Sequence, residues 1–136
     1  MPSLVIRPFE PADYVTLVGY PTVHGAPAFT AVIDGQVAAC AGVEVFPRAP
    51  VGHAWAYIGP VAKPHGIFVA RGVVRGLLEI IREHRLVRVE ADTIRGWASA
   101  QRWLEWMGFE AEGVMPKRGP QGEDMIRYAL FPKGAA

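Results

Sequence analysis

The sequence predicts an α/β fold with a mixed central sheet, and three features of the chain support this class. The stretch from Ala54 to Arg85 reads as a short apolar strand, a turn rich in proline and glycine, and a long amphipathic helix. The next segment, Leu86–Ile94, alternates apolar and charged residues with the period of a strand. Asp34-Gly35 lies between two apolar runs and is a strong hairpin signal. Strand–helix–strand units connect parallel strands, whereas hairpins are antiparallel, so both kinds of pairing are expected.

The first third of the chain is expected to form a strand, a short helix and a hairpin. The first strand is Leu4–Pro8, and Asp13 is placed to cap a helix over Tyr14–Val18. The segment Gly19–Pro27 has the composition of a loop. The two strands joined by the Asp34-Gly35 turn are Phe29–Ile33 and Gln36–Phe46.

The central unit begins with the strand Ala54–Ile58, which ends at Gly59-Pro60 because proline cannot continue a ladder. A helix begins near Gly66. Its apolar residues recur every three or four positions and define the side expected to face the sheet: Ile67, Ala70, Val73, Val74, Leu77, Leu78 and Ile81. We also expect Phe68 to turn into the core, since burying phenylalanine is worth roughly 1.5–3 kcal/mol.

Three further elements complete the predicted fold. A second helix covers Trp97–Met107 and ends at Gly108, a residue that suits the left-handed position after a helix. Two more strands, Phe109–Met115 and Asp124–Phe131, are joined by a polar loop. The predicted order is β-α-β-β-β-α-β-α-β-β, in a single domain over residues 1–136.

The composition restricts the classes of function. A net charge of +1 offers no electrostatic case for binding nucleic acid. The single cysteine, Cys40, excludes an internal disulfide and a multi-cysteine zinc site, so no metal is expected. No run of about 18 apolar residues is present, so the sequence predicts no membrane span. These features together favour a cytoplasmic protein.

The start of the long helix is the first candidate site. A helix start presents unpaired N–H groups and the positive end of the helix dipole, which suits a phosphate. Lys63, His65, Arg71 and Arg75 add positive or potentially positive charge around this point. The alternative is an ordinary solvated helix surface on which Arg75 pairs with Glu79.

The same stretch resembles motif A of the GNAT (Gcn5-related N-acetyltransferase) superfamily. Ile58, Pro60, Gly66 and Ile67 match the motif without a gap, and Lys63 stands where the family has glutamine or arginine. The opening LVIRPFEPAD resembles the first strand of the family, and AQRWLEWMGFEAEG resembles its second helix and the strand after it. The resemblance therefore covers nearly the whole chain.

This resemblance implies a GNAT-like sheet and transfer of an acetyl group from acetyl-CoA to an amine acceptor of unknown identity. In the family, the backbone N–H groups of this loop hold the pyrophosphate of acetyl-CoA. The positions that the resemblance assigns to acetyl-CoA binding are Ile58, Lys63, His65, Gly66, Ile67, Phe68 and Arg71.

Acetyl transfer needs a base for the amine and an acid for the departing thiolate. Glu44, His53 and Tyr57 lie on or beside the strands where the family usually places its base. His53 suits a base near neutral pH, and Tyr57 suits the acid. The alternative is that Glu44 and His53 are solvated and that Tyr57 is a packing residue.

Three positions differ from the family pattern and favour an alternative function. Phe68 stands where the family has a small residue, Trp97 replaces an asparagine, and Leu104 replaces a tyrosine. The alternative is a catalytically silent GNAT-like structural or binding subunit. Small acetyltransferase-like proteins of podophages look similar in length and motif, so this alternative includes a virion-associated phage protein.

The second helix is unusually aromatic. Trp103, Leu104 and Met107 share one side and are expected in the core. Trp97 and Trp106 fall outside it and predict an exposed patch, which would be covered by a protein partner or by a second copy of the chain.

Overall fold

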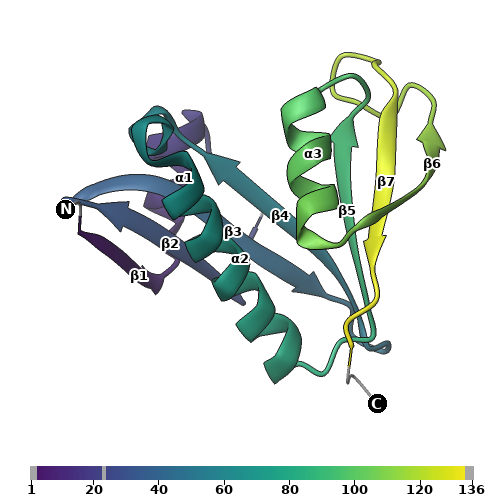
Figure 1. Cartoon of the computed structure of the whole chain (residues 1–136), viewed down its shortest axis with the longest axis horizontal. Helices are drawn as coiled ribbons and strands as arrows, with labels where there is room; N and C mark the ends of the chain where they lie inside the picture. Colours follow the sequence, from purple (N-terminus) through teal and green to yellow (C-terminus); the bar gives the residue numbers. More distant parts are fainter. Residues whose placement is uncertain (1–2, 23, 134–136) are drawn as a thin grey trace. The chain divides into compact units, whose positions relative to one another are not determined.

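The computed structural model describes residues 3–22 and 24–133, which form two compact units (Figure 1). The first unit contains the described chain up to Val45 together with Ala54–His84. The second contains Phe46–His53 and the described chain from Arg85 onward. The expectation of a single domain over residues 1–136 stays a prediction.

The elements follow the predicted order. They are β1 (Leu4–Pro8), α1 (Pro11–Val18), β2 (Ala28–Ile33), β3 (Gln36–Val45), β4 (Val51–Ile58), η1 (Pro60–His65), α2 (Gly66–Glu83), β5 (Arg88–Ile94), α3 (Ala98–Met107), β6 (Glu110–Met115) and β7 (Met125–Leu130). The strand order is β1-β2-β3-β4-β5-β7-β6. Val51–His53 of β4 pairs in parallel with Arg88–Glu90 of β5, whereas β1–β2, β2–β3, β5–β7 and β6–β7 pair antiparallel. The predicted α/β class with a mixed sheet is therefore confirmed.

Several boundaries differ from the sequence prediction. Strand β4 begins at Val51 rather than Ala54, and its parallel pairing with β5 lies in these added residues. Helix α1 begins at Pro11 rather than Tyr14, because proline in the first turn costs the helix no hydrogen bond. The turn after β4 is a short 3₁₀ helix, η1, which leads directly into α2 at Gly66. The predicted start of α2 near Gly66 is confirmed.

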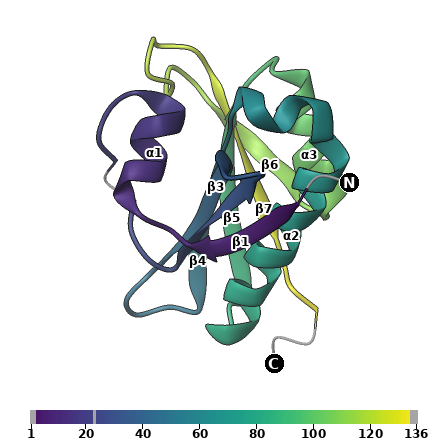
Figure 2. The same cartoon turned by 90° about the vertical axis from the view of Figure 1, so that its left-hand side faces the viewer.

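In the first unit, α1 and α2 lie on opposite faces of the strands (Figure 2). Cys40 of β3 packs in a cluster with Tyr14 of α1. On the other face, a Cβ atom added to Gly76 of α2 would lie 2.5 Å from the ring of Phe29 on β2. The absence of a side chain at Gly76 therefore lets α2 approach the sheet closely.

The predicted core-facing side of α2 is partly wrong. The buried residues are Val69, Gly72, Val73, Gly76, Leu77, Ile80 and Ile81. Ile67 is 72% exposed and Phe68 is 42% exposed, so the expectation that Phe68 turns into the core is wrong. Gly72 and Gly76 belong to the buried stripe, but a search for apolar side chains in the sequence does not find them. Phe68 lies in the first turn of α2, and the buried stripe begins one residue after it, at Val69.

Asp13 joins α1 to β1 and β2. The prediction that Asp13 is the capping residue before the helix is wrong. The capping position is Glu10, and Asp13 lies inside the first turn. Its carboxylate accepts hydrogen bonds from the Glu10 backbone N–H at 2.9 Å, from Arg7 at 2.7 and 2.8 Å and from the Thr30 hydroxyl at 2.6 Å. The Arg7 hydrogen bonds are the largest cause that lowers the pKa of Asp13, to about 2.

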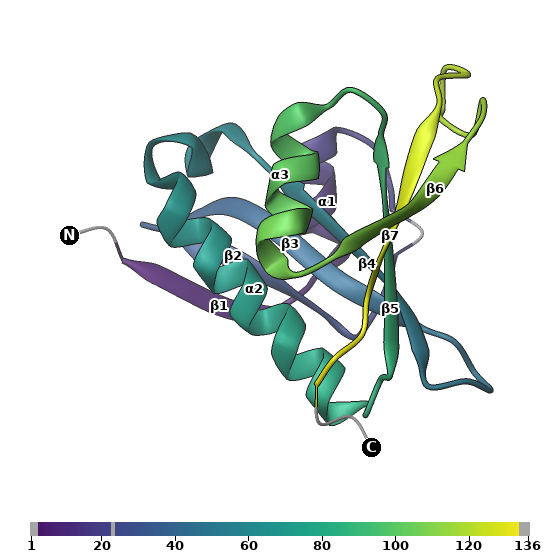
Figure 3. The same ribbon diagram turned by 45° about the vertical axis from the view of Figure 1, so that its right-hand side comes forward.

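The second unit contains a ribbon of three strands in which β7 lies between β5 and β6 (Figure 3). Along β5, Val89, Ala91 and Thr93 are buried, and the residues between them are partly exposed and polar. This alternation agrees with the period of two in the sequence. Helix α3 ends at Gly108, which has a φ of 104° and lies beside Leu130 of β7. In the part of the chain that the structure describes, no helix is both long and apolar enough to span a membrane.

Trp97 and Trp106 lie at the surface, each 57% exposed, as the sequence predicts. Leu104 is buried and Trp103 is partly buried. Coverage of the exposed pair by a partner or a second copy stays a prediction.

We expect acrylamide to quench the tryptophan fluorescence in two phases, because Trp97 and Trp106 are accessible and Trp55 is only 7% exposed. The double variant Trp97→Phe/Trp106→Phe should lose the easily quenched phase, whereas Trp103→Phe should keep it. Uniform protection of all four tryptophans in a monomeric sample would contradict this expectation.

Candidate functional site

The connection from β4 to α2 is held tightly at its beginning. The backbone N–H of Gly59 donates a hydrogen bond to the carbonyl of Ala38 on β3 at 2.8 Å. A Cβ atom at Gly59 would overlap the end of the Leu17 side chain on α1, so that side chain would have to move to admit a larger residue. The chain then passes through η1 and enters α2. This packing fixes the position of the α2 start relative to the end of β4.

The start of α2 is open. Gly66 is exposed, and a Cβ atom added to it would find no atom within 4 Å. His65 precedes the helix and makes no capping hydrogen bond with its side chain, and the first turn contains no acidic residue. Lys63 and Arg71 are exposed on either side of the helix start. The helix start therefore carries two exposed cations and no acidic side chain, a distribution of charge that favours an anion there.

Apolar side chains surround the same segment. Ile58, at the end of β4, is 50% exposed, and Ile67 and Phe68 open the helix with exposed side chains. The seven positions that the sequence assigns to cofactor binding thus lie along one continuous segment of the first unit. They combine a positive helix start with an apolar surface.

Of the three predicted catalytic residues, Glu44 and Tyr57 belong to the first unit. Glu44 of β3 is hydrogen-bonded to Nδ1 of His24 at 2.7 Å. The His24 ring stacks on Trp55 of β4, with centroids 4.2 Å apart and an interplanar angle of 10°. The ring of Tyr57 lies 5.9 Å from His24 and 4.9 Å from Tyr14 of α1. His24 therefore links Glu44 to an aromatic cluster that contains Tyr57.

Sequence reasoning missed this arrangement, because His24 lies in a loop with no local signal of a partner. One signal was available in β3, where Gly42 lies two residues before Glu44 on the same side of the strand. A Cβ atom at Gly42 would lie 2.9 Å from the Trp55 ring, so the glycine gives the indole room to lie against β3.

Two buried groups, the hydroxyl of Tyr14 and the thiol of Cys40, are held in their neutral forms. Burial, assisted by Tyr57, raises the pKa of the Tyr14 hydroxyl to about 12. Burial also raises the pKa of the Cys40 thiol to about 12. Cys40 is therefore a packing residue rather than a nucleophile.

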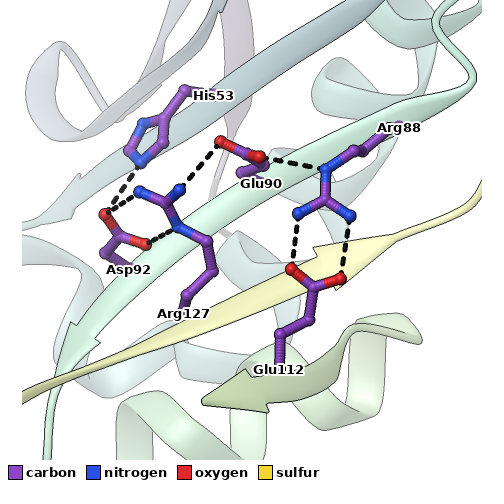
Figure 4. Close-up of polar contacts among 6 residues, drawn as sticks. All are labelled: His53, Arg88, Glu90, Asp92, Glu112 and Arg127. Carbon is purple, nitrogen blue, oxygen red and sulfur yellow. Dashed lines mark hydrogen bonds and ion pairs between the residues drawn. The ribbon is translucent and has the colours of Figure 1, made fainter. Parts of the chain in front are cut away.

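His53 belongs to the second unit, where it begins a network of charged side chains (Figure 4). Its Nε2 atom lies 3.2 Å from Oδ2 of Asp92. Arg127 donates two hydrogen bonds to the same carboxylate, at 2.9 and 3.2 Å. Burial alone would raise the pKa of Asp92, but the hydrogen bonds from His53 and Arg127 outweigh it and hold the pKa well below its usual range.

The network continues across the ribbon (Figure 4). Glu90 accepts a hydrogen bond from Arg88 at 2.9 Å and lies 3.3 Å from Arg127. Arg88 also donates two hydrogen bonds to the carboxylate of Glu112 on β6, one of them from Nη1 to Oε2 at 2.8 Å. Glu90 and Asp92 therefore join β5 to β7 through Arg127, and Arg88 joins β5 to β6 through Glu112. The role of His53 as a base stays a prediction.

No group of three or more histidine, cysteine, aspartate or glutamate side chains in the described residues could hold a metal ion.

The chain resembles known proteins in its structure rather than in its sequence. No protein-family model matches the chain, and no curated protein sequence matches it. Among solved structures, the ribosomal-protein-S18-alanine N-acetyltransferase of Escherichia coli is 17% identical, with a TM-score of 0.76 over 95% of this chain and 94% of that one. A GNAT-family acetyltransferase of Streptococcus pneumoniae is 15% identical, with a TM-score of 0.75 over 95% and 99% of the two chains.

This chain has the GNAT fold. A third similar GNAT-fold structure is yncA of Salmonella typhimurium, solved with its cofactor acetyl-CoA; it is 16% identical, with a TM-score of 0.73 over 98% and 96% of the chains. The low identities agree with a divergent sequence on the GNAT fold. The fold that the motif-A resemblance implied is thereby confirmed.

Proposed function

We propose that this protein transfers the acetyl group of acetyl-CoA to an amine. The observation that carries the proposal is the open start of α2, which has no acidic residue, follows β4 through the short helix η1 in a GNAT fold and is flanked by Lys63 and Arg71. The similar structures are acetyltransferases, and one of them was solved with acetyl-CoA, which further supports the proposal. These neighbours do not favour the alternative of a catalytically silent subunit.

In this proposal, the pyrophosphate of acetyl-CoA accepts hydrogen bonds from the N–H groups at Gly66, Ile67 and Phe68. Lys63 and Arg71 supply the countercharge, and His65 lies next to the same anion. The exposed Ile58 side chain offers apolar surface to the pantetheine arm. The anion thus binds where the helix dipole and the cationic side chains act in the same direction.

Acetyl-CoA supplies a thioester, whose carbonyl carbon is attacked by the neutral form of the acceptor amine. Glu44 and Tyr57 are the candidates in the first unit for receiving and supplying protons, and His53 is the candidate in the second unit. The hydroxyl of Tyr57 would serve as the acid that protonates the departing thiolate.

Calorimetric titration with acetyl-CoA tests the proposal, with one binding site per chain as the expected result. Release of free thiol in the presence of an amine would then establish transfer. Absence of binding heat at several temperatures, together with absence of thiol release, would overturn the proposed function.

The side chain of Phe68 gives a further prediction for this site. Since it is 42% exposed and stands where the family has a small residue, we expect Phe68→Ala to bind acetyl-CoA several-fold more tightly than the original protein. The free energy of unfolding should fall by about 1–2 kcal/mol, because more than half of the Phe68 surface is buried. Calorimetry and urea unfolding of the two proteins measure both quantities. Weaker binding by Phe68→Ala would show instead that the ring contributes to the cofactor site.

A further inference from the structure

We propose that the cluster around His24 binds the acceptor as a cationic primary amine with an apolar body, and that His24 removes its proton. The inference rests on the proposed acetyl transfer and assigns the acceptor class and a base to that reaction. Five residues define the amine cluster: Tyr14, His24, Glu44, Trp55 and Tyr57. All five belong to the first unit.

The His24–Glu44 hydrogen bond decides which nitrogen of the histidine can act. A carboxylate only accepts hydrogen bonds, so the 2.7 Å contact places the proton of neutral His24 on Nδ1. The lone pair is then on Nε2, the nitrogen that can accept a proton from an amine. The side chain of His24 is 17% exposed and that of Glu44 is 49% exposed, so solvent reaches both members of the pair.

The aromatic rings suit a cation that carries an apolar group. Cations bind over aromatic faces with about 0.5–2 kcal/mol of favourable energy, depending on solvent exposure. Tyr57 is partly exposed and provides such a ring 5.9 Å from His24, whose partner Glu44 supplies the opposite charge, whereas the Trp55 ring is covered by the stacked His24. The indole Nε1 of Trp55 is buried and has no hydrogen-bond partner among the described residues. A polar atom of a bound acceptor, or a water molecule, would satisfy that donor.

The amine cluster also lies on the strand that leads to the proposed acetyl-CoA site. Trp55 and Tyr57 point to the same side of β4, and Tyr57 is followed by Ile58 and by the Gly59 turn into α2. An amine bound here is therefore on the same strand as the segment assigned to the cofactor.

The reaction step is balanced as follows. The ammonium group of the acceptor gives one proton to Nε2 of His24 and becomes a neutral amine. Its nitrogen forms a bond to the carbonyl carbon of the thioester, the carbon–sulfur bond breaks, and the electron pair leaves with sulfur. The second proton lost by the nitrogen goes to the thiolate, which departs as the free thiol of CoA, and imidazolium returns its proton to water. Glu44 stabilises the imidazolium that forms.

The first test measures binding of phenethylammonium, a primary amine with an apolar body, by NMR of the histidine and tryptophan side chains. We expect saturable shifts at His24 and Trp55, with an affinity at least ten-fold weaker in Glu44→Gln. Glu79→Gln, which removes an exposed carboxylate on α2, is the matched control and should bind like the original protein. Phenethyl alcohol tests the need for charge. Absence of saturable shifts, or equal binding of the alcohol, would overturn the inference.

The second test measures thiol release from acetyl-CoA with phenethylamine as acceptor. A general base contributes about 10²–10⁴-fold, so His24→Gln should lower kcat at least 100-fold with little change in KM for acetyl-CoA. An unchanged kcat, or no turnover by an original protein that binds both substrates, would overturn the assignment of His24. If phenethylammonium binds but acetyl-CoA does not, the proposed function fails while the amine site stands. If acetyl-CoA binds but phenethylammonium does not, the amine site is rejected and the proposed function stands.

Discussion

Replacing Asp13 by alanine is expected to lower the free energy of unfolding by about 3 kcal/mol at pH 7. Breaking a buried charged pair costs roughly 3–5 kcal/mol, and the lower end applies because the Arg7 side chain is 35% exposed. The substitution also leaves the hydroxyl of Thr30, which is fully buried, without its acceptor at 2.6 Å. Three elements, β1, α1 and β2, lose their common contact.

The same carboxylate predicts a dependence of stability on pH. Its pKa is lowered to about 2 in the folded chain, against about 3.9 for an unperturbed aspartate. A group whose pKa is lowered by folding stabilises the folded state above its unfolded pKa, and that contribution is lost as the pH falls through the folded value. The contribution of Asp13 should therefore be complete at pH 5 and decline between about pH 4 and pH 2.

Urea unfolding at pH 7, 4, 3 and 2 measures both effects. The difference between the original protein and Asp13→Ala should shrink as the pH falls from 4 to 2. Glu79→Ala, at an exposed position of α2, should change stability by less than about 0.5 kcal/mol. A difference at pH 7 below about 1 kcal/mol would show that Asp13 does not hold these elements together.

Reversing both charges beside the α2 start is expected to weaken acetyl-CoA binding about 100-fold, or roughly 2.7 kcal/mol, in the variant Lys63→Glu/Arg71→Glu. Each substitution replaces an attraction to the pyrophosphate by a repulsion. Both residues are exposed, so the fold should tolerate the change. Titration calorimetry at constant ionic strength measures the loss.

The control for this variant carries the same change in net charge away from the helix start. Arg82→Glu/Arg85→Glu alters two exposed arginines, one in the last turn of α2 and one two residues after the helix ends. We expect its affinity for acetyl-CoA to stay within about three-fold of the original value, because the charges are far from the helix start and screened by salt. Equal losses in the two variants would point to a general charge effect rather than a site at Lys63 and Arg71.

The parts of the fold that the sequence predicts well are those with strong local signals. The Asp34-Gly35 turn joins β2 to β3 as expected, and the alternation along β5 correctly separates buried from polar residues. The start of α2 follows from the Gly59-Pro60 break and the helical spacing after it. These signals depend on neighbouring residues, so they can be read without knowing what each element packs against.

The orientation of α2 was harder to predict because packing decides it. Gly72 and Gly76 are buried against β1 and β2, where small size is the useful property, and a search for apolar side chains does not find them. As a result, the predicted stripe was shifted toward Ile67, which is exposed.

The side-chain partnerships were also beyond the reach of sequence patterns. His24 and Glu44 are 20 residues apart, and His53 and Asp92 are 39 apart. Each pair forms only because the strand order brings distant segments together. The sequence identified Glu44 and His53 as chemically suitable residues, but it carried no information about which partner would hold each one.

The central claim, that the start of α2 holds the pyrophosphate of acetyl-CoA, is tested most directly by amide NMR during a titration with acetyl-CoA. The account predicts that the N–H resonances of Gly66, Ile67 and Phe68 shift in proportion to saturation. Inorganic pyrophosphate should shift the same three amides at higher concentration. Saturable binding of acetyl-CoA that leaves these amides unmoved, while resonances elsewhere shift, would contradict the account.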